Sequence, residues 1–244
     1  MMNRYFYDFH VHSCLSPCGD HDMTPNNIAG MAAIKGLQIV ALTDHNSTKN
    51  CRAFFSAAKK NGIIPIAGME MTTAEDIHLV CLFPTLEKAE AFDVAYQKHR
   101  ILYPNRPDIF GEQLILDEND NIIGEEKHLL LNASDLSVSD AVKLLKTYDA
   151  VVFPAHIDRE ENGMISSLGC IPKEPYFHIV EFRDKSVVES YVQQYGLSDK
   201  RILTDSDAHY LWDISEAENF LTLEDEPYSS AFVRASLFRL LGGK

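Results

Sequence analysis

The sequence lacks the features of a secreted or membrane protein. Its 244 residues include five cysteines, an odd number scattered through a chain long enough to fold without disulfides. No run of about 18 apolar residues occurs, and the first apolar segment begins at Tyr5 without the longer apolar core of a signal peptide. We therefore expect a soluble, cytoplasmic protein with reduced thiols and no membrane partner.

Positive charge is also scarce. The chain has 22 Lys and Arg against 36 Asp and Glu, which gives a formal net charge of −14. At long range such a charge repels nucleic acid and anionic membranes. We expect a small substrate and no duplex nucleic acid as a partner, although three bound divalent ions would add about +6 near a site.

Short apolar runs alternate with segments of helical character along most of the chain. The runs that we interpret as strands cover residues 5–9, 39–42, 63–67, 77–83, 150–154, 179–182 and 202–204. The helical segments cover residues 24–35, 48–61, 86–99, 137–147, 186–195 and 229–241, the first with Thr24 as N-cap and Pro25 in its first turn. This alternation predicts a single α/β domain over residues 1–244 with a mostly parallel sheet, open or closed into a barrel.

Residues 103–131 interrupt the alternation. Apolar runs at residues 112–116 and 121–123 flank the turn-forming Asp117-Glu118-Asn119-Asp120, and this pattern predicts a β-hairpin insertion. The insertion would form a lid, a dimer contact or a surface excursion without a role in chemistry. We predict no oligomeric state from it.

Candidate metal ligands follow the predicted strands. His10 and His12 come directly after the first strand, and alternation places residues i and i+2 on one face, where both imidazoles can reach one ion. By itself, this H-x-H pair is also typical of two hydrogen-bonded strand histidines. Four further strand ends carry candidate ligands, namely His45, Glu70, His156, and Asp207 with His209. Because the carboxyl ends of parallel strands meet at one edge of such a fold, these side chains should converge.

Two more positions need separate arguments. His78 begins its run, but a hairpin that turns at residues 73–75 would set it opposite Glu70, where the two side chains could share an ion. The alternative is a hydrogen-bonded strand histidine. In the turn that follows Gly19, any one of Asp20, His21 and Asp22 could be a ligand or a solvated turn residue.

Imidazoles and carboxylates together suit zinc, manganese or iron, and this set is too large for one ion, so we expect two or three divalent ions. Adjacent ions lower the pKa of a bridging water and hold the attacking and leaving oxygens of a displacement at phosphorus. The pattern therefore indicates hydrolysis of a phosphate ester.

The motifs that carry these residues resemble those of the polymerase and histidinol phosphatase (PHP) family. Asp8-Phe9-His10-Val11-His12-Ser13 resembles the first family motif, Leu42-Thr43-Asp44-His45-Asn46 the second, Gly68-Met69-Glu70-Met71 with Ile77-His78-Leu79-Val80 the third, and Asp205-Ser206-Asp207-Ala208-His209 the last. Pro154-Ala155-His156 resembles a further histidine of the family. The resemblance covers most of the chain and implies a distorted (β/α)7 TIM-like barrel with a trinuclear metal site.

The resemblance also implies how the ligands are shared. His10, His12, Glu70 and Asp207 would hold the first ion, Glu70 with His78 and His156 the second, and Asp20, or else His21, with His45 and His209 the third. Asp207, Glu70 and His209 would be the residues closest to the chemistry.

Other side chains near the strand ends have two interpretations each. Arg159 and Arg183 would hold a substrate phosphate or form surface ion pairs. Asp44 and Asp205 would orient an imidazole or cap a helix. Cys14 and Cys18 have a spacing seen in metal sites, but without a second thiolate pair in the nearby sequence we expect packed thiols.

The function that follows is a metal-dependent phosphoesterase, in which a hydroxide that bridges the ions hydrolyses a small phosphomonoester, or the phosphate at the end of a nucleotide. One alternative is a metal-dependent amidohydrolase, an enzyme class that often uses a carboxylated lysine. Only Lys173 and Lys185 are near a suitable strand, and both are poorly placed. The other alternative is a non-catalytic, metal-stabilised PHP module.

Overall fold

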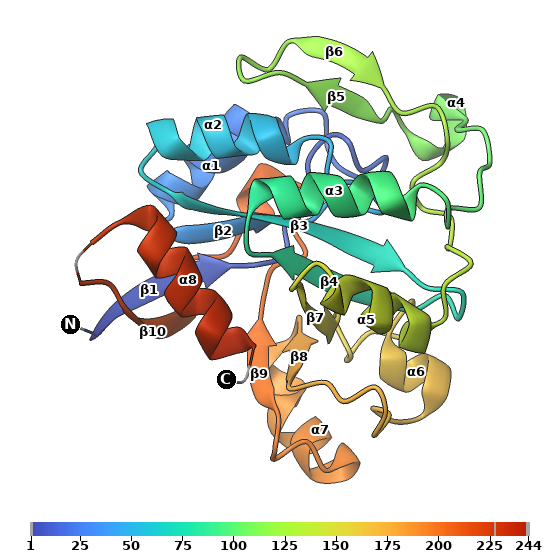
Figure 1. Ribbon diagram of the computed structural model, residues 1–244, viewed down its shortest axis with the longest axis vertical. Helices are drawn as coiled ribbons and strands as arrows, with labels where there is room; N and C mark the ends of the chain where they lie inside the picture. The colour runs from blue at the N-terminus through green and yellow to red at the C-terminus, as the bar shows by residue number, and fades with distance from the viewer. Residues whose placement is uncertain (1, 227, 243–244) are drawn as a thin grey trace.

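The computed structural model describes residues 2–226 and 228–242. Its centre is a curled six-stranded sheet in the order β10-β1-β2-β3-β4-β7. These strands are β1 (Met2–Asp8), β2 (Ile39–Leu42), β3 (Ile64–Thr72), β4 (His78–Phe83), β7 (Val151–Pro154) and β10 (Phe220–Glu224). A parallel pair, β8 (Ile179–Phe182) and β9 (Arg201–Thr204), lies beside β7 (Figure 1).

The strand directions differ in part from the prediction. β1, β2 and β3 run parallel as expected, whereas β4 is antiparallel to both β3 and β7. The short turn between β3 and β4 leaves no room for a crossover helix, so the two strands form a hairpin. All seven predicted strands are present, but β3 extends to Thr72, five residues beyond the predicted end. Strand β10, which pairs antiparallel with β1, was not predicted.

Individual backbone hydrogen bonds connect the six-stranded sheet to the β8–β9 pair, so that the strands together form a barrel-like arrangement. The Ile157 amide donates to the Glu181 carbonyl at 2.9 Å and joins the end of β7 to β8. The His12 amide donates to the Ala208 carbonyl at 2.9 Å and joins the segments that follow β1 and β9. The predicted α/β, barrel-like fold is therefore confirmed, while the count of seven β/α units stays a prediction.

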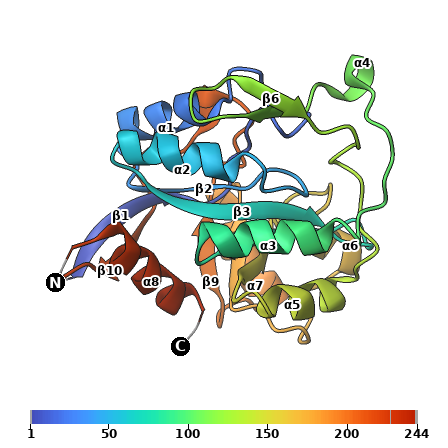
Figure 2. The ribbon, with the colours of Figure 1, turned by 45° about the horizontal axis from the view of Figure 1, so that its top comes forward.

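Helices cover the outside of the curled sheet (Figure 2). They are α1 (Pro25–Ile34), α2 (Cys51–Lys60), α3 (Leu86–Tyr96), α5 (Val138–Lys146), α6 (Met164–Leu168), α7 (Val188–Tyr195) and α8 (Ser230–Leu241). Short 3-10 helices span Lys185–Val187 and Leu211–Asp213. No helix in the described ranges is long and apolar enough to cross a membrane.

Local sequence explains where these helices begin and what they bury. The Thr24 hydroxyl caps α1 by accepting a hydrogen bond from the Asn27 amide, as predicted. In α2 the buried residues Cys51, Phe54 and Ala57 recur every three positions, so one face of the helix packs onto β3.

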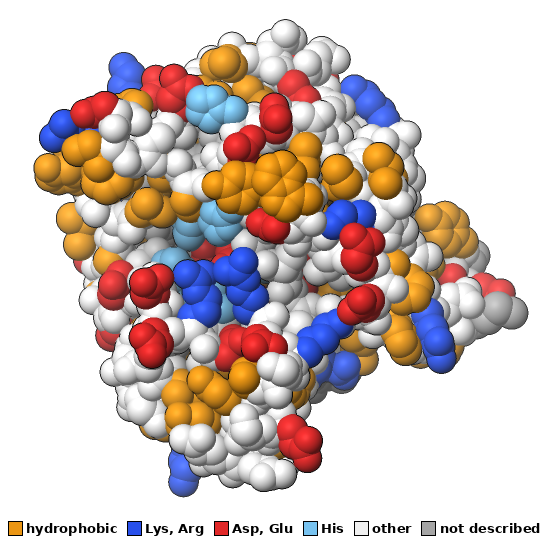
Figure 3. All heavy atoms as spheres, turned by 180° about the vertical axis from the view of Figure 1, so that it is seen from behind, with side chains coloured by type: hydrophobic (Ala, Val, Ile, Leu, Met, Phe, Trp, Pro, Cys, Tyr) orange, Lys and Arg blue, Asp and Glu red, His pale blue; other side chains and the backbone are white. Residues whose placement is uncertain are grey.

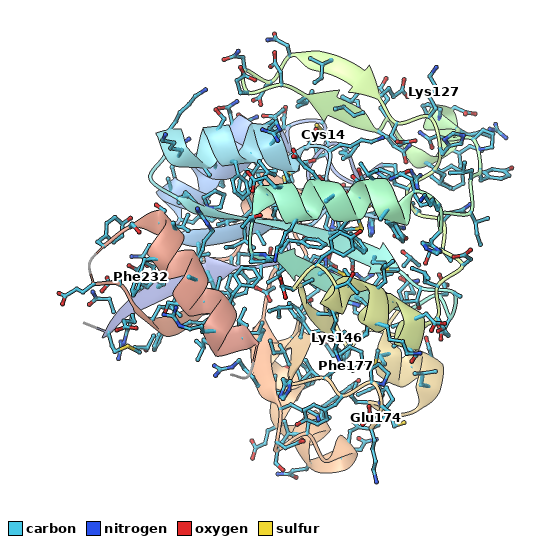
Figure 4. The ribbon with its side chains drawn as sticks, in the orientation of Figure 1. Cys14, Lys127, Lys146, Glu174, Phe177 and Phe232 are labelled. Carbon is cyan, nitrogen blue, oxygen red and sulfur yellow. The ribbon has the colours of Figure 1, made fainter. Side chains whose placement is uncertain are left out.

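The predicted hairpin insertion is present as β5 (Leu114–Leu116) and β6 (Ile122–Glu125), preceded by the short helix α4 (Pro107–Phe110). The hairpin lies over the loop that follows β1, because the Leu114 amide donates to the Cys14 carbonyl at 3.0 Å. Cys14 is buried between the hairpin and the α1–α2 side of the molecule (Figure 4). At Gly111 (φ 97°) a Cβ would come within 2.2 Å of the Pro17 carbonyl oxygen, so the insertion packs tightly onto this loop.

Candidate metal centre

Most of the predicted ligands converge at one edge of the curled sheet. Figure 3 shows histidine side chains in a hollow on this face, next to Lys or Arg side chains. The convergent residues are His10 and His12 after β1, His45 after β2, Glu70 in β3, His78 at the start of β4, His156 after β7, and Asp207 and His209 after β9. Strand ends distant in sequence thus form one cluster.

The carboxylate of Glu70, which is fully buried, lies at the centre of this cluster. Its two oxygens lie within 2.8–3.3 Å of nitrogens on five imidazoles. These belong to His10 (3.3 Å), His12 (3.3 Å), His45 (2.9 Å), His78 (2.8 Å) and His156 (3.1 Å). A single carboxylate cannot hydrogen-bond to five rings at once with good geometry, so the arrangement is that of a carboxylate shared between cations.

A second carboxylate, that of Asp207, also approaches His10 and His12. Its Oδ1 is 3.5 Å from His10 Nε2 and 3.2 Å from His12 Nε2, while its Oδ2 accepts a hydrogen bond from Arg159 at 2.8 Å. The Arg183 guanidinium lies 3.8 Å from the same oxygen. The two arginines thus border the cluster, and both are partly exposed to solvent.

Hydrogen bonds on the outer side of the rings fix which nitrogen faces the cluster. The Nδ1 of His10 lies 3.0 Å from the Glu181 carboxylate, which can only accept, so Nδ1 carries the proton. The Nδ1 of His12 lies 3.0 Å from the Ser16 hydroxyl, whose own proton is donated to Asp44 at 2.7 Å. In both rings Nε2 is therefore left with its lone pair directed inward.

The inward-facing atoms fit divalent cations. His10 Nε2, His12 Nε2, His45 Nδ1 and Glu70 Oε2 are buried, and although they lie close to one another none of them forms a hydrogen bond with suitable geometry. Buried polar atoms without partners are costly and rare unless an ion satisfies them. Three groups have ligand atoms within 4.8 Å of one another: His10, His12, Glu70 and Asp207; His45, Glu70 and His78; and His12, His45 and His209.

The electrostatics of the cluster also favour cations. Burial opposes a charge on the Glu70 carboxyl, but the neighbouring His78 and His10 outweigh it and lower the pKa of Glu70 well below its usual value. Burial also lowers the pKa of the His10 imidazole, but the Glu181 and Glu70 carboxylates outweigh it and raise that pKa well above its usual value. The pKa values of His12 and His45 are raised as well, so metal binding at these three rings competes with protons.

Two residues of the cluster have left-handed backbone conformations. His156 has φ 26° and Asp207 has φ 51°, a region that non-glycine residues seldom adopt. Such strain persists only where the surrounding structure holds it, and it is typical of functional sites.

The turn of the β3–β4 hairpin is centred one residue later than predicted, which shifts the strand register by two residues. Its turn is centred on Glu75, so His78 pairs with Thr72 and Glu70 pairs with Val80. His78 and Glu70 are diagonal rather than opposite, yet His78 Nδ1 still reaches Glu70 Oε1 at 2.8 Å. A diagonal neighbour two positions along a strand stays on the same face, and this keeps the contact.

The loop that precedes α1 departs from expectation. The Asp20 carboxylate accepts a hydrogen bond from the Asp22 amide at 2.9 Å, and His21 is 66% exposed and paired with Glu112. Neither residue belongs to a ligand group found in the described part of the chain. Cys18 lies in the same loop, near His45 and His209: partial loss of hydration raises the pKa of its thiol, but these two imidazoles outweigh that effect and lower the pKa to about 5.

Several supporting residues were missed or misjudged from the sequence. Glu181, a buried acid in the apolar strand β8, was missed, although an acid inside such a run is itself a signal. Asp44 acts through Ser16 rather than on an imidazole directly. Asp205 accepts the Phe9 amide at 2.6 Å and so holds the end of β1.

A cavity of about 750 Å³ adjoins the cluster. It is lined by cationic Arg159, Arg183 and Lys185, by Ser206 beside Asp207, and by several acids. One of these acids, Asp158, is occupied in accepting the backbone amides of Arg183 and Asp184 at 3.0 and 2.8 Å. The volume suits a small ligand or one unit of a polymer.

A barrel-like α/β fold with imidazoles and carboxylates at its strand ends defines a class of proteins that hold divalent metal ions at this edge. The model of the PHP domain family matches residues 8–140, more than half of the chain. The chain therefore belongs to the PHP domain family.

One curated relative is the error-prone DNA polymerase of Symbiobacterium thermophilum, which is 36% identical over 77 residues. The match covers 32% of this chain and 7% of the polymerase, so this chain corresponds to a small part of that protein.

Solved structures share the fold over nearly the whole chain. The lesion-specific endonuclease Q of Pyrococcus furiosus has a TM-score of 0.67 at 16% identity, over 99% of this chain and 56% of that one. A putative metal-dependent phosphoesterase of Bifidobacterium adolescentis has a TM-score of 0.61 at 17% identity, over 96% of both chains.

One comparison corrects the expectation that duplex nucleic acid is excluded. Endonuclease Q has also been solved with a 27-mer duplex that carries an abasic lesion at its active site, with a TM-score of 0.61 and 15% identity, over 99% of this chain and 57% of that one. The expectation was wrong because the net charge of −14 is a sum over the whole chain. That sum does not describe the local field at the cluster, which includes the guanidinium groups of Arg159 and Arg183.

Proposed function

We propose that this protein is a metal-dependent phosphoesterase that hydrolyses a phosphate ester of a nucleotide unit. The observation that carries the proposal is the Glu70 carboxylate surrounded by five imidazoles, with Asp207 and two arginines at its border. When bound, two or three Zn, Mn or Fe ions would act as Lewis acids and lower the pKa of a coordinated water.

In this proposal the nine ligands expected from the motifs are distributed over three ions, and the geometry supports them to different degrees. His10, His12, Glu70 and Asp207 would hold one ion, and Glu70 with His78 and His156 a second. His45 and His209 would hold a third. Asp20, whose carboxylate points to its own turn, has the weakest support from the geometry.

The arginines give the site its preference for phosphate. Arg159 and Arg183 both approach Asp207 Oδ2 from the side of the cavity, and a planar guanidinium can bind two phosphate oxygens at once. A phosphate group bound by these two arginines would lie beside the cluster. Its remaining oxygens would then face the imidazoles and Glu70. His209 Nδ1 lies 2.8 Å from the Asp207 carbonyl, which leaves Nε2 for an ion or for the leaving oxygen.

An exposed aromatic pair supports a nucleotide unit over a sugar phosphate. Tyr210 follows His209 directly and stacks on Trp212, with ring centroids 5.2 Å apart and planes 15° apart. Both rings are exposed, Trp212 by 70%. Exposed aromatic rings next to a phosphate site can stack on a base.

The duplex-bound structure of endonuclease Q supports the inclusion of polymeric substrates, either at a strand end or at a lesion within the strand. A cytoplasmic location belongs to the same proposal, since all five cysteines are free thiols, which suits a reducing compartment.

The test is a hydrolysis screen with Mn²⁺ or Zn²⁺ over a mononucleotide, an oligonucleotide with a terminal phosphate, a duplex with an abasic lesion, histidinol phosphate and a sugar phosphate. We expect turnover of at least one nucleotide-containing substrate, lost in His10→Ala and in Asp207→Asn. His99→Ala is the matched control, because His99 is a partly exposed histidine paired with Asp135. Activity unchanged in both cluster variants would refute the proposal, and activity on the sugar phosphate alone would refute the nucleotide preference.

A further inference from the structure

The group formed by His12, His45 and His209 consists of three imidazoles within 4.8 Å of one another. The positions expected to supply the remaining ligand, Asp20 or else His21, lie outside the group in the described part of the chain. Because His12 Nε2 also belongs to the group of the first ion, a third ion would be left with the neutral imidazoles of His45 and His209 and no anionic ligand.

The thiol of Cys18 lies at this gap. It is within hydrogen-bonding reach of the imidazoles of both His45 and His209, which come from different strand ends. Cys18 is solvent-exposed, whereas Cys14, Cys51 and Cys81 are buried away from solvent. Cys18 is thus accessible to an ion from solvent while its sulfur faces two ring nitrogens.

The loop around Cys18 is held in place by its own backbone. The Gly19 amide donates to the Ser16 carbonyl at 2.8 Å, and the Asp20 amide donates to the His209 carbonyl at 2.9 Å. The Ser16 hydroxyl also accepts the His45 amide at 3.1 Å. The loop is therefore fastened to both histidines that the thiol approaches.

Gly19 allows this turn to be tight. A Cβ at this position would lie 2.5 Å from the Ser13 carbonyl oxygen, a contact that only glycine avoids. The conformation that presents Cys18 is thus built into the sequence on both sides of the cysteine.

An independent observation points to a bound cation. The His12 ring is fully buried, and its Nε2 has no hydrogen-bond partner. Because Ser16 occupies Nδ1, Nε2 is the only atom that His12 can offer to the group. A buried ring nitrogen that is grouped with two other imidazoles and has no hydrogen-bond partner fits a cation ligand.

From this geometry we infer that Cys18, and not Asp20, is the anionic ligand of the third ion, together with His45 and His209. The inference rests on the proposed metal centre and specifies its chemistry. A thiolate is a soft ligand, so this position would select zinc or iron over manganese or magnesium. The thiol would release its proton when the ion binds.

The test uses the full-length, metal-free protein under reducing conditions, titrated with Co²⁺. We expect a near-ultraviolet charge-transfer band from thiolate to Co²⁺ in the wild type, and its loss in Cys18→Ser. Cys170→Ser is the matched control because Cys170 is also an exposed free thiol. Metal content should fall by about one ion per chain in Cys18→Ser and stay unchanged in Asp20→Asn.

Three outcomes are decisive. Loss of the band in Cys18→Ser, with native circular dichroism and the band kept in Cys170→Ser, supports the inference. Binding of Co²⁺ without a thiolate band, or loss of an ion in Asp20→Asn but not in Cys18→Ser, overturns the inference and leaves the proposed metal centre intact. Failure of the wild type to bind Co²⁺ or Zn²⁺ at all overturns the metal centre itself.

Discussion

Replacing Glu181 by glutamine should weaken metal binding while leaving the fold intact. Glu181 is fully buried, faces His10 Nδ1 at 3.0 Å and accepts the His156 amide at 3.1 Å. Glutamine keeps the volume and one acceptor oxygen, but it removes the negative charge that holds the His10 proton on the outer nitrogen. His10 Nε2 then becomes a weaker ligand.

The size of the effect follows from this hydrogen bond. A hydrogen bond to a charged group contributes about 1.5–3 kcal/mol, and one between neutral groups about half of that. The expected loss is therefore about 0.8–1.5 kcal/mol, or roughly four- to thirteenfold in metal affinity. The upper part of this range reaches the lower end of the roughly 10–100-fold cost of mutating such supporting groups.

The assay is a competition titration of Zn²⁺ between the protein and a chromogenic chelator. Glu90→Gln is the control, because Glu90 on α3 forms a surface pair with Arg52 on α2, outside the cluster. Wild-type affinity in Glu181→Gln would refute the assignment of Glu181 as the group that orients His10.

Four further predictions follow from the same geometry. Arg159→Ala should raise KM for a phosphate ester without loss of metal, because the guanidinium contacts Asp207 Oδ2 and faces the cavity; an unchanged KM would contradict its role in holding phosphate. Gly68→Ala should lower the free energy of unfolding in urea by about 1–3 kcal/mol, because an added Cβ would lie 2.7 Å from Thr43 Cγ2; a change below about 0.5 kcal/mol would show that the strands are not packed so closely. Removing the metal with a chelator should lower Tm by about 8–16 °C for each site emptied. A free metal concentration of about 1,000 times Kd stabilises the fold by about 4 kcal/mol, and each kcal/mol raises Tm by about 2–4 °C. An equal Tm with and without chelator in differential scanning fluorimetry would contradict this. Metal affinity should keep rising with pH above 6.5, the ordinary pKa of histidine, because the pKa values of His10 and His45 are raised and metal must compete with protons on these rings. Isothermal titration calorimetry over a range of pH measures this, and a metal affinity that stops rising at about pH 6.5 would contradict it.

The strands and the ligands at their ends were predictable because they depend on local periodicity. A run such as Ile39–Leu42, buried at all four positions, shows as an apolar segment, and His45 follows three residues after its end. Thr24 was recognised as a helix cap for the same reason, since its partner is three residues away. Convergence then followed from the rule that strand ends meet at one edge.

The supporting contacts were not predictable, because they join residues far apart in the chain. Glu181 and His10 are separated by 171 positions, and nothing near Glu181 indicates its partner. The position of Cys18 depends on a loop held by His45 and His209, and the register of His78 depends on where one turn is centred. Whole-chain charge misled the expectation about duplex nucleic acid because it averages over the local field of the site.

The most direct test of the central claim is the metal content of the full chain, purified without chelator and measured by inductively coupled plasma mass spectrometry. We predict about two to three divalent ions per chain, falling by about one in Asp207→Asn. Less than about one ion per chain in the wild type, with an unchanged value in Asp207→Asn, would contradict the multinuclear centre.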